Sequence, residues 1–157
     1  MSVLIVSEDA LTMTPAQQVA KALEIAFHAH NGQFEMDGRP YLFHPMRLAS
    51  RAATDDQRIV ALLHDTVEDT DVTLEGLRAA GFPEHVVTAV DHMTKREGED
   101  YDAFVERALQ DPIAARVKLL DIEDNMDLTR IPEVAEKDLA RAAKYHRARR
   151  RILEALS

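Results

Sequence analysis

The chain has 157 residues, of which 46% are hydrophobic and 30% are charged, and its formal net charge is −9 at pH 7. This composition is typical of one folded domain and excludes an intrinsically disordered chain. The sequence contains no cysteine, which excludes disulfides, thiolate zinc sites and cysteine nucleophiles. The negative charge argues against non-specific binding of nucleic acid.

The N-terminal segment carries no recognisable targeting signal. The apolar run 3–6 is too short for a signal peptide and is soon followed by Glu8 and Asp9. No apolar run approaches the length that spans a bilayer. We therefore expect a cytoplasmic protein without a membrane partner, and residues 1–13 give no indication of their role.

Helix signals recur along the rest of the chain. Thr14 and Gln17 form a capping box around Pro15, and Thr54 with Gln57 reads as a second capping box. No stretch alternates convincingly between apolar and polar residues, so the fold class is all-α, with about eight helices in a single domain over 1–157. The expected helices cover about 15–30, 44–52, 55–65, 74–80, 83–93, 101–108, 112–125 and 133–156.

A group of polar residues closes one of these apolar helical runs. His64 and Asp65 end the run, and Glu68 and Asp69 follow one turn later. A continuous helix would place His64 with Glu68 on one face, and Asp65 with Asp69 on one face. An imidazole beside three carboxylates is costly to bury without a positive charge among them. A divalent metal ion would supply that charge.

Two residues elsewhere are candidates to complete such a metal site. His44 lies at a helix start, and Asp121 interrupts the apolar stretch from Val117 to Ile122. Two imidazoles and two carboxylates suit Mn, Fe, Zn or Co and leave positions open for water and substrate. Alternatively, His44 is only a helix-start residue and Asp121 is exposed, and the residues alone leave both interpretations open.

Several motifs follow one another in a fixed order over about residues 16–150. They are His30–Gln33, Gly38–Pro45, Ala61–Thr70, Thr94–Lys95, Val117–Asp121 and Asn125–Met126. This ordered set resembles the HD-type metal-dependent phosphohydrolases. Within them it is similar to the hydrolase domain of RelA/SpoT-type alarmone enzymes and to the stand-alone small alarmone hydrolases. No synthetase segment follows the matched core, so a free-standing hydrolase is expected.

The resemblance implies an all-helical HD-domain bundle that holds one Mn²⁺ ion. It also implies removal of pyrophosphate from the 3′ position of (p)ppGpp, a small phosphorylated nucleotide. The implied metal ligands are His44, His64, Asp65 and Asp121. The implied catalytic residues, which act on the attacking water, are Glu68 and Asp69. The implied substrate-binding residues are Asn125, Lys95, Arg141 and Tyr145.

Two positions depart from the family pattern. Glu35-Met36 stands where the family usually carries Arg-Lys, and a glutamate repels phosphate, although Arg39 nearby would partly substitute as a substrate-binding cation. Asp124 stands where the family usually has histidine, which adds negative charge near the expected substrate. These departures leave other phosphorylated nucleotides open as substrates, including ppApp and NADPH. A metal-retaining nucleotide sensor and a purely structural helical domain are further alternatives.

Overall fold

A computed structural model describes residues 12–157, so most of the segment 1–13 lies outside the described residues. The described part is all-helical apart from an isolated bridge between Phe34 and Pro40, which confirms the predicted fold class. None of its helices has both the length and the apolar character needed to cross a membrane. In chain order the elements are α1 (Pro15–Ala29), α2 (Phe43–Arg51), α3 (Asp55–Leu63), α4 (Thr66–Asp69), α5 (Leu74–Ala79), α6 (Glu84–His92), α7 (Tyr101–Ala108), α8 (Pro112–Asn125), a 3₁₀ helix (Leu128–Arg130) and α9 (Glu136–Leu156).

The two predicted capping boxes have different outcomes. At α1 the box is complete, because Gln17 N–H donates to Thr14 Oγ1 at 3.2 Å and Thr14 N–H donates to Gln17 Oε1 at 2.8 Å. At α3 only half of the box forms. Gln57 N–H donates to Thr54 Oγ1 at 3.2 Å, but the Gln57 side chain accepts from Ala53 N–H at 3.0 Å instead of from Thr54.

The chain turns a corner after Leu63, near the expected end of this helix. His64 Nδ1 lies 2.7 Å from the carbonyl oxygen of Ala61, and Thr66 Oγ1 donates to the carbonyl oxygen of Leu63 at 2.8 Å. These side chains form hydrogen bonds with carbonyl oxygens at the end of α3, in place of the backbone N–H groups of a further helical turn. The helix therefore ends at Leu63, close to the expected end near residue 65, and α4 begins after Asp65. His64 and Asp65 thus lie at the corner between α3 and α4.

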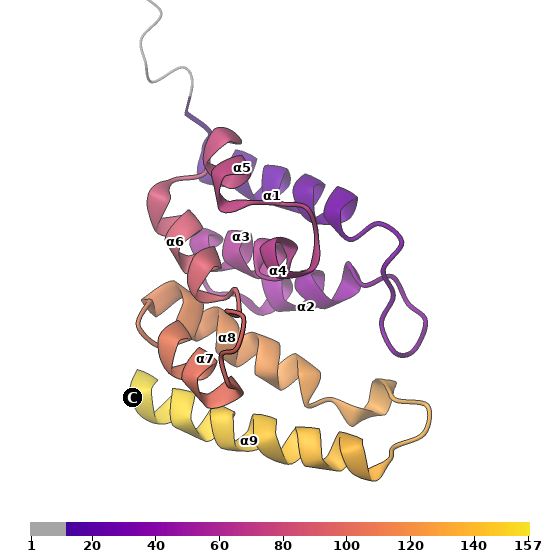
Figure 1. Ribbon diagram of the computed structural model, residues 1–157. Coiled ribbons are helices and arrows are strands. Elements are labelled where there is room, and N and C mark those ends of the chain that lie inside the picture. The colour runs from indigo at the N-terminus through magenta and orange to yellow at the C-terminus, as the bar shows by residue number, and fades with distance from the viewer. Residues whose placement is uncertain (1–11) are drawn as a thin grey trace, which may run out of the picture.

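The apolar core consists of two clusters that share α8. The larger cluster includes Leu48 of α2 and Val117 of α8, and the smaller one includes Val105 of α7, Ile122 of α8 and Ile152 of α9. A helix that is apolar on more than one side becomes buried on more than one side. Accordingly, Figure 1 shows α8 between the helices α1 to α6 and the long helix α9.

Two connections extend from the same side of the molecule. One is the loop between α1 and α2, and the other is the segment between α8 and α9 (Figure 1). Both contribute residues to one pocket, since Phe34 comes from the first and Ile131 from the second. The fold thus places these loops around the same opening.

Replacing a core leucine tests this packing. Leu48 is 0% exposed, whereas Leu139 on α9 is 55% exposed. We expect Leu48→Ala to lower the free energy of unfolding by about 2–5 kcal/mol, because it removes buried methyl groups and leaves a cavity. Leu139→Ala makes the same chemical change at the surface and should cost about 0.5 kcal/mol or less. Urea denaturation measures both, and equal losses would contradict the assigned core.

Candidate metal centre

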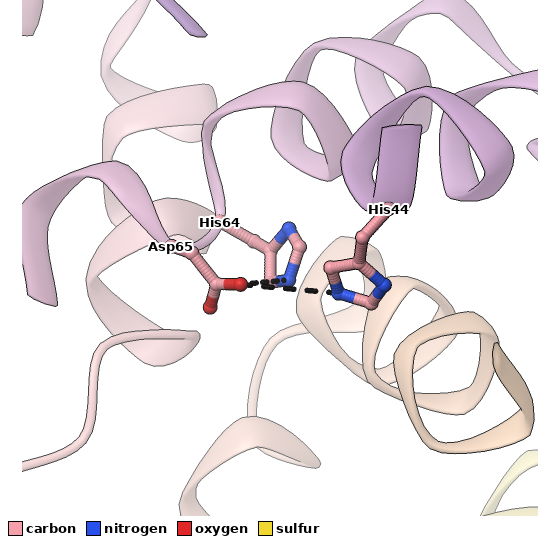
Figure 2. Close-up of side chains that lie close together, drawn as sticks. All are labelled: His44, His64 and Asp65. Carbon is pink, nitrogen blue, oxygen red and sulfur yellow. Dashed lines mark ion pairs between the residues drawn. The ribbon is translucent and has the colours of Figure 1, made fainter. Parts of the chain in front are cut away.

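Three parts of the fold bring the four predicted metal ligands together. His44 comes from the first turn of α2, His64 and Asp65 from the corner between α3 and α4, and Asp121 from α8. His44 Nε2 lies 3.3 Å from Asp121 Oδ1 and 3.8 Å from Asp65 Oδ2. His64 Nε2 lies 3.0 Å from the same Asp65 oxygen. Figure 2 shows His44, His64 and Asp65 pointing toward one another, and one possible ligand atom of each lies within 4.8 Å of the other two.

The outer nitrogen of each imidazole is already engaged. His64 Nδ1 lies 2.7 Å from the carbonyl oxygen of Ala61, and His44 Nδ1 lies 2.7 Å from Asp124 Oδ2. Because a carbonyl or carboxylate oxygen only accepts, each Nδ1 carries the hydrogen. In the neutral imidazole, Nε2 then holds the free lone pair that a metal ion requires.

The donor atoms of this cluster fit a divalent cation. His64 Nε2 is buried and makes no hydrogen bond, although Asp65 Oδ2 lies close to it. A buried nitrogen without a hydrogen bond is costly unless it binds something else. Two imidazole nitrogens together with the oxygens of Asp65 and Asp121 form a mixed donor set typical of Mn, Fe, Zn or Co.

The carboxylates of the cluster attract positive charge. Burial lowers the pKa of His44, but its bonds to Asp121 and Asp124 outweigh burial and raise that pKa to about 10. Burial is also the largest single effect on His64 and lowers its pKa, but the charge and hydrogen bonding of Asp65 together with the charge of Asp121 give a net increase. The positive charge that the carboxylates require is therefore supplied either by protons on the imidazoles or by a divalent cation.

Neighbouring side chains fix the orientation of the two aspartates. Lys118 Nζ donates to Asp121 Oδ2 at 3.0 Å, and Asn125 Nδ2 donates to Asp121 Oδ1 at 2.8 Å. The Tyr41 hydroxyl donates to Asp65 Oδ2. Asn125, a predicted substrate-binding residue, thus also holds a predicted ligand in place.

A cavity of about 180 Å³ opens onto the cluster, and Glu68 and Asp69 of α4 line it. Burial, followed by the charges of Asp65 and Glu68, raises the pKa of Asp69 to about 6. Asp69 is therefore a carboxyl group that exchanges a proton near neutral pH. Glu68 Oε1 accepts the backbone N–H of Lys95 at 2.7 Å, which fixes the Glu68 side chain at the cavity.

A second pocket, of about 210 Å³, adjoins this cavity. Arg141 and Tyr145 of α9 line it, as their predicted role in substrate binding requires. Arg141 Nη2 lies 3.0 Å from Asp138 Oδ1 and 3.5 Å from Met36 Sδ, a residue of the loop between α1 and α2. The residues that line both the cavity and the pocket are Tyr41, His44 and Asn125.

Two other predicted substrate-binding residues line neither of these spaces. The side chain of Lys95 is exposed and does not line the cavity, although its backbone contacts Glu68. The Arg39 side chain is 64% exposed, and its Nε lies 3.4 Å from Asp37 Oδ2 at a third pocket, which shares Asp37, Asp127 and Arg130 with the second pocket. The substrate-binding roles of Lys95 and Arg39 stay predictions that no contact in the structure supports.

Two acidic residues expected to repel phosphate are neutralised by arginines. Arg47 Nε donates to Asp124 Oδ1 at 2.8 Å, and Arg47 Nη1 donates to Glu35 Oε2 at 3.1 Å. Arg130 Nη2 donates to Asp124 Oδ2 at 3.1 Å. The expectation of uncompensated charge at Glu35 and Asp124 was therefore wrong. Neither arginine was predicted from the sequence as a partner of these acids, although Arg47 lies three residues after His44 on α2, a spacing that places it on the same helix face.

No family model matches the chain. The chain is similar to the guanosine-3′,5′-bis(diphosphate) 3′-pyrophosphohydrolase of Aquifex aeolicus, with 35% identity over 124 residues that cover 71% of this chain and 17% of that protein. It is also similar to a probable GTP pyrophosphokinase of Mycobacterium leprae, with 36% identity over 121 residues that cover 69% of this chain and 15% of that protein. The chain thus spans less than a fifth of the length of these relatives.

Among solved structures, the chain is similar to a metazoan ortholog of SpoT that hydrolyses ppGpp. The TM-score is 0.71 at 22% identity, and the match covers 92% of this chain and 88% of that chain. This likeness confirms the predicted all-helical HD fold.

Metal titration tests the cluster directly. We expect the protein to bind about one divalent cation per chain, and His64→Ala to weaken that binding by about 100-fold or more, because losing a ligand costs more than losing one of its hydrogen-bond partners. The measurement is isothermal titration with Mn²⁺. His85→Ala is the matched control, since His85 is exposed and its Nε2 lies 3.0 Å from Asp56 on the surface. Equal affinity in both variants would contradict the assigned centre.

Proposed function

Since the chain is a relative of RelA/SpoT-type alarmone enzymes in sequence and in fold, we propose that it is a metal-dependent phosphohydrolase that removes the 3′-pyrophosphate of (p)ppGpp. One observation carries this proposal. The His/Asp cluster and the pocket lined by Arg141 and Tyr145 are adjacent and share Tyr41, His44 and Asn125. A nucleoside in the pocket would therefore present its phosphates to the cluster.

We propose His44, His64, Asp65 and Asp121 as the ligands of one Mn²⁺ ion. The choice of Mn²⁺ follows the resemblance, and Fe, Zn or Co would satisfy the same donors. When bound, a divalent cation supplies positive charge against the phosphate oxygens and acidifies a water molecule. The buried Nε2 of His64, which has no hydrogen-bond partner, supports this assignment.

Glu68 and Asp69 are proposed to accept the proton of the attacking water. Water attacks the phosphorus bonded to O3′, the O3′–P bond breaks, and O3′ takes up a proton as pyrophosphate leaves. The raised pKa of Asp69, about 6, makes it a base that is mostly ionised at neutral pH and that still accepts a proton readily. Tyr41 holds the Asp65 carboxylate during this step, and Lys118 holds that of Asp121.

The second pocket is proposed to bind the nucleoside. Tyr145 offers an aromatic ring, while Met36 and Ile131 add apolar surface, and these suit the faces of a purine. Arg141 contributes a cation to the same pocket, where it would contact phosphate. Its contact with Asp138 aims the guanidinium but also offsets part of its charge.

A specific observation favours a second candidate substrate class. The pocket is lined by two arginines, Arg130 and Arg141, and both are paired with aspartates. A nucleotide with fewer charges than (p)ppGpp, such as NADPH, would suit such a pocket. The sensor alternative is less well supported, because Glu68 and Asp69 line the cavity where a binding module has no use for them.

Phosphate and pyrophosphate release from ppGpp, pppGpp, ppApp, NADPH, GTP and ATP tests the proposal. We expect Mn²⁺-dependent pyrophosphate release from ppGpp, its loss in chelator, and its loss in Asp65→Ala. Glu68→Gln should lower kcat by about 10²–10⁴-fold, because it removes a proton acceptor but keeps the shape of the side chain. The matched control is Glu75→Gln, since Glu75 is exposed on α5.

The substrate panel also separates the alternatives. Turnover of NADPH or ppApp alone would keep the mechanism and replace the substrate. Metal binding without turnover of any of the six compounds would contradict the proposed hydrolysis and favour the sensor.

A further inference from the structure

A chain of ion pairs runs from His44 to the wall of the substrate pocket. We call its members Glu35, Arg47, Asp124 and Arg130 the Arg47 network. Arg47 contacts both acids, and Arg130 contacts Asp124 and lies 4.0 Å from Glu35. The network joins α2, the end of α8 and the loop between α1 and α2. None of its members is a predicted ligand or catalytic residue.

Asp124 is the centre of this network, and its carboxylate accepts hydrogen bonds from three different side chains. Its Oδ2 accepts from His44 Nδ1 at 2.7 Å, from Arg47 Nη2 at 2.9 Å and from Arg130 Nη2 at 3.1 Å. Its Oδ1 accepts from Arg47 Nε at 2.8 Å. The Asp124 side chain is only 7% exposed. A carboxylate with this many donors has little freedom to move.

We infer that Asp124 is a positioning residue for the metal ligand His44, and that Arg47 acts through Asp124. A hydrogen bond from Nδ1 to a carboxylate sets the tautomer and the ring orientation of a ligating histidine, and it raises the basicity of Nε2. Arg47 donates hydrogen bonds to both oxygens of Asp124 and thereby fixes the plane of this carboxylate. The orientation of the carboxylate in turn sets the orientation of the His44 ring. The inference rests on the metal site proposed above.

The charges of the network make the inference testable by sign. The formal charges of its two acids and two arginines sum to zero. The network as a whole therefore adds no net negative charge near the proposed metal site. Removing the cation of Arg47 would tighten the binding of a divalent cation if electrostatics alone governed affinity. Removing it would weaken binding if Arg47 positions Asp124, because the carboxylate then loses two of its four donor contacts. The two accounts therefore predict opposite changes.

The experiment is a Mn²⁺ titration by calorimetry of the full chain and two variants. Asp124→Asn should weaken Mn²⁺ binding by about 10–100-fold, as expected for a partner of a ligating histidine. Arg47→Gln should weaken it by about threefold or more despite the loss of a positive charge. Asp127→Asn is the matched control, because Asp127 also contacts Arg130 but has an exposed side chain and no contact with His44. It should leave the affinity unchanged.

Each outcome is decisive. Binding to either Asp124→Asn or Arg47→Gln as tight as to the wild type, or tighter, overturns the inference while the proposed metal site stands. A wild-type chain that binds no divalent cation overturns the proposed site as well. Circular dichroism and thermal unfolding in chelator establish that the variants fold. If Asp124→Asn does not fold, the sign of the change in Arg47→Gln decides alone.

Discussion

The compensation of buried negative charge is the constraint on which this structure depends. Asp65 and Asp121 lie where α2, α3 and α8 meet, at the edge of an apolar core, and Asp124 lies next to them. Burying carboxylates in such a place costs several kcal/mol each unless donors and cations surround them. The fold supplies some of these groups locally, as with Lys118 and His64, and others from distant segments, as with Tyr41 and His44. The buried carboxylates are thus largely compensated by their surroundings, and the donor atoms that remain fit a divalent cation.

Helix α8 carries residues of the apolar core as well as charged residues of the cluster. Its residues Val117 and Ile122 enter the two core clusters, while Lys118, Asp121 and Asn125 recur at intervals of three and four and so share one face. That face is directed at the histidine cluster, since Asp121 Oδ1 lies 3.3 Å from His44 Nε2 and 3.8 Å from His64 Nε2. Because both apolar clusters hold α8 in place, the position of Asp121 is set by packing as well as by its hydrogen bonds.

The sequence was sufficient to predict the fold class, the longer helices and the candidate residues of the cluster. Helical periodicity and capping residues such as Thr14 are local signals, and the resemblance carried by the order of the motifs grouped His44, His64 and Asp121. The short helix α4 and the corner before it were not predicted, because they depend on the donation of the Thr66 side chain to a carbonyl oxygen.

The compensation of the Glu35 and Asp124 charges by arginines was not predicted from the sequence. This pairing forms only in the folded chain, since Arg47 lies 77 residues from Asp124 in sequence. The sign and the number of charges can be read from the sequence, but their pairing cannot.

Because α8 belongs to both apolar clusters, it stays packed against one cluster when the helices of the other move away. The backbone amides of α8 should therefore be better protected from exchange with deuterium than those of helices that belong to one cluster alone.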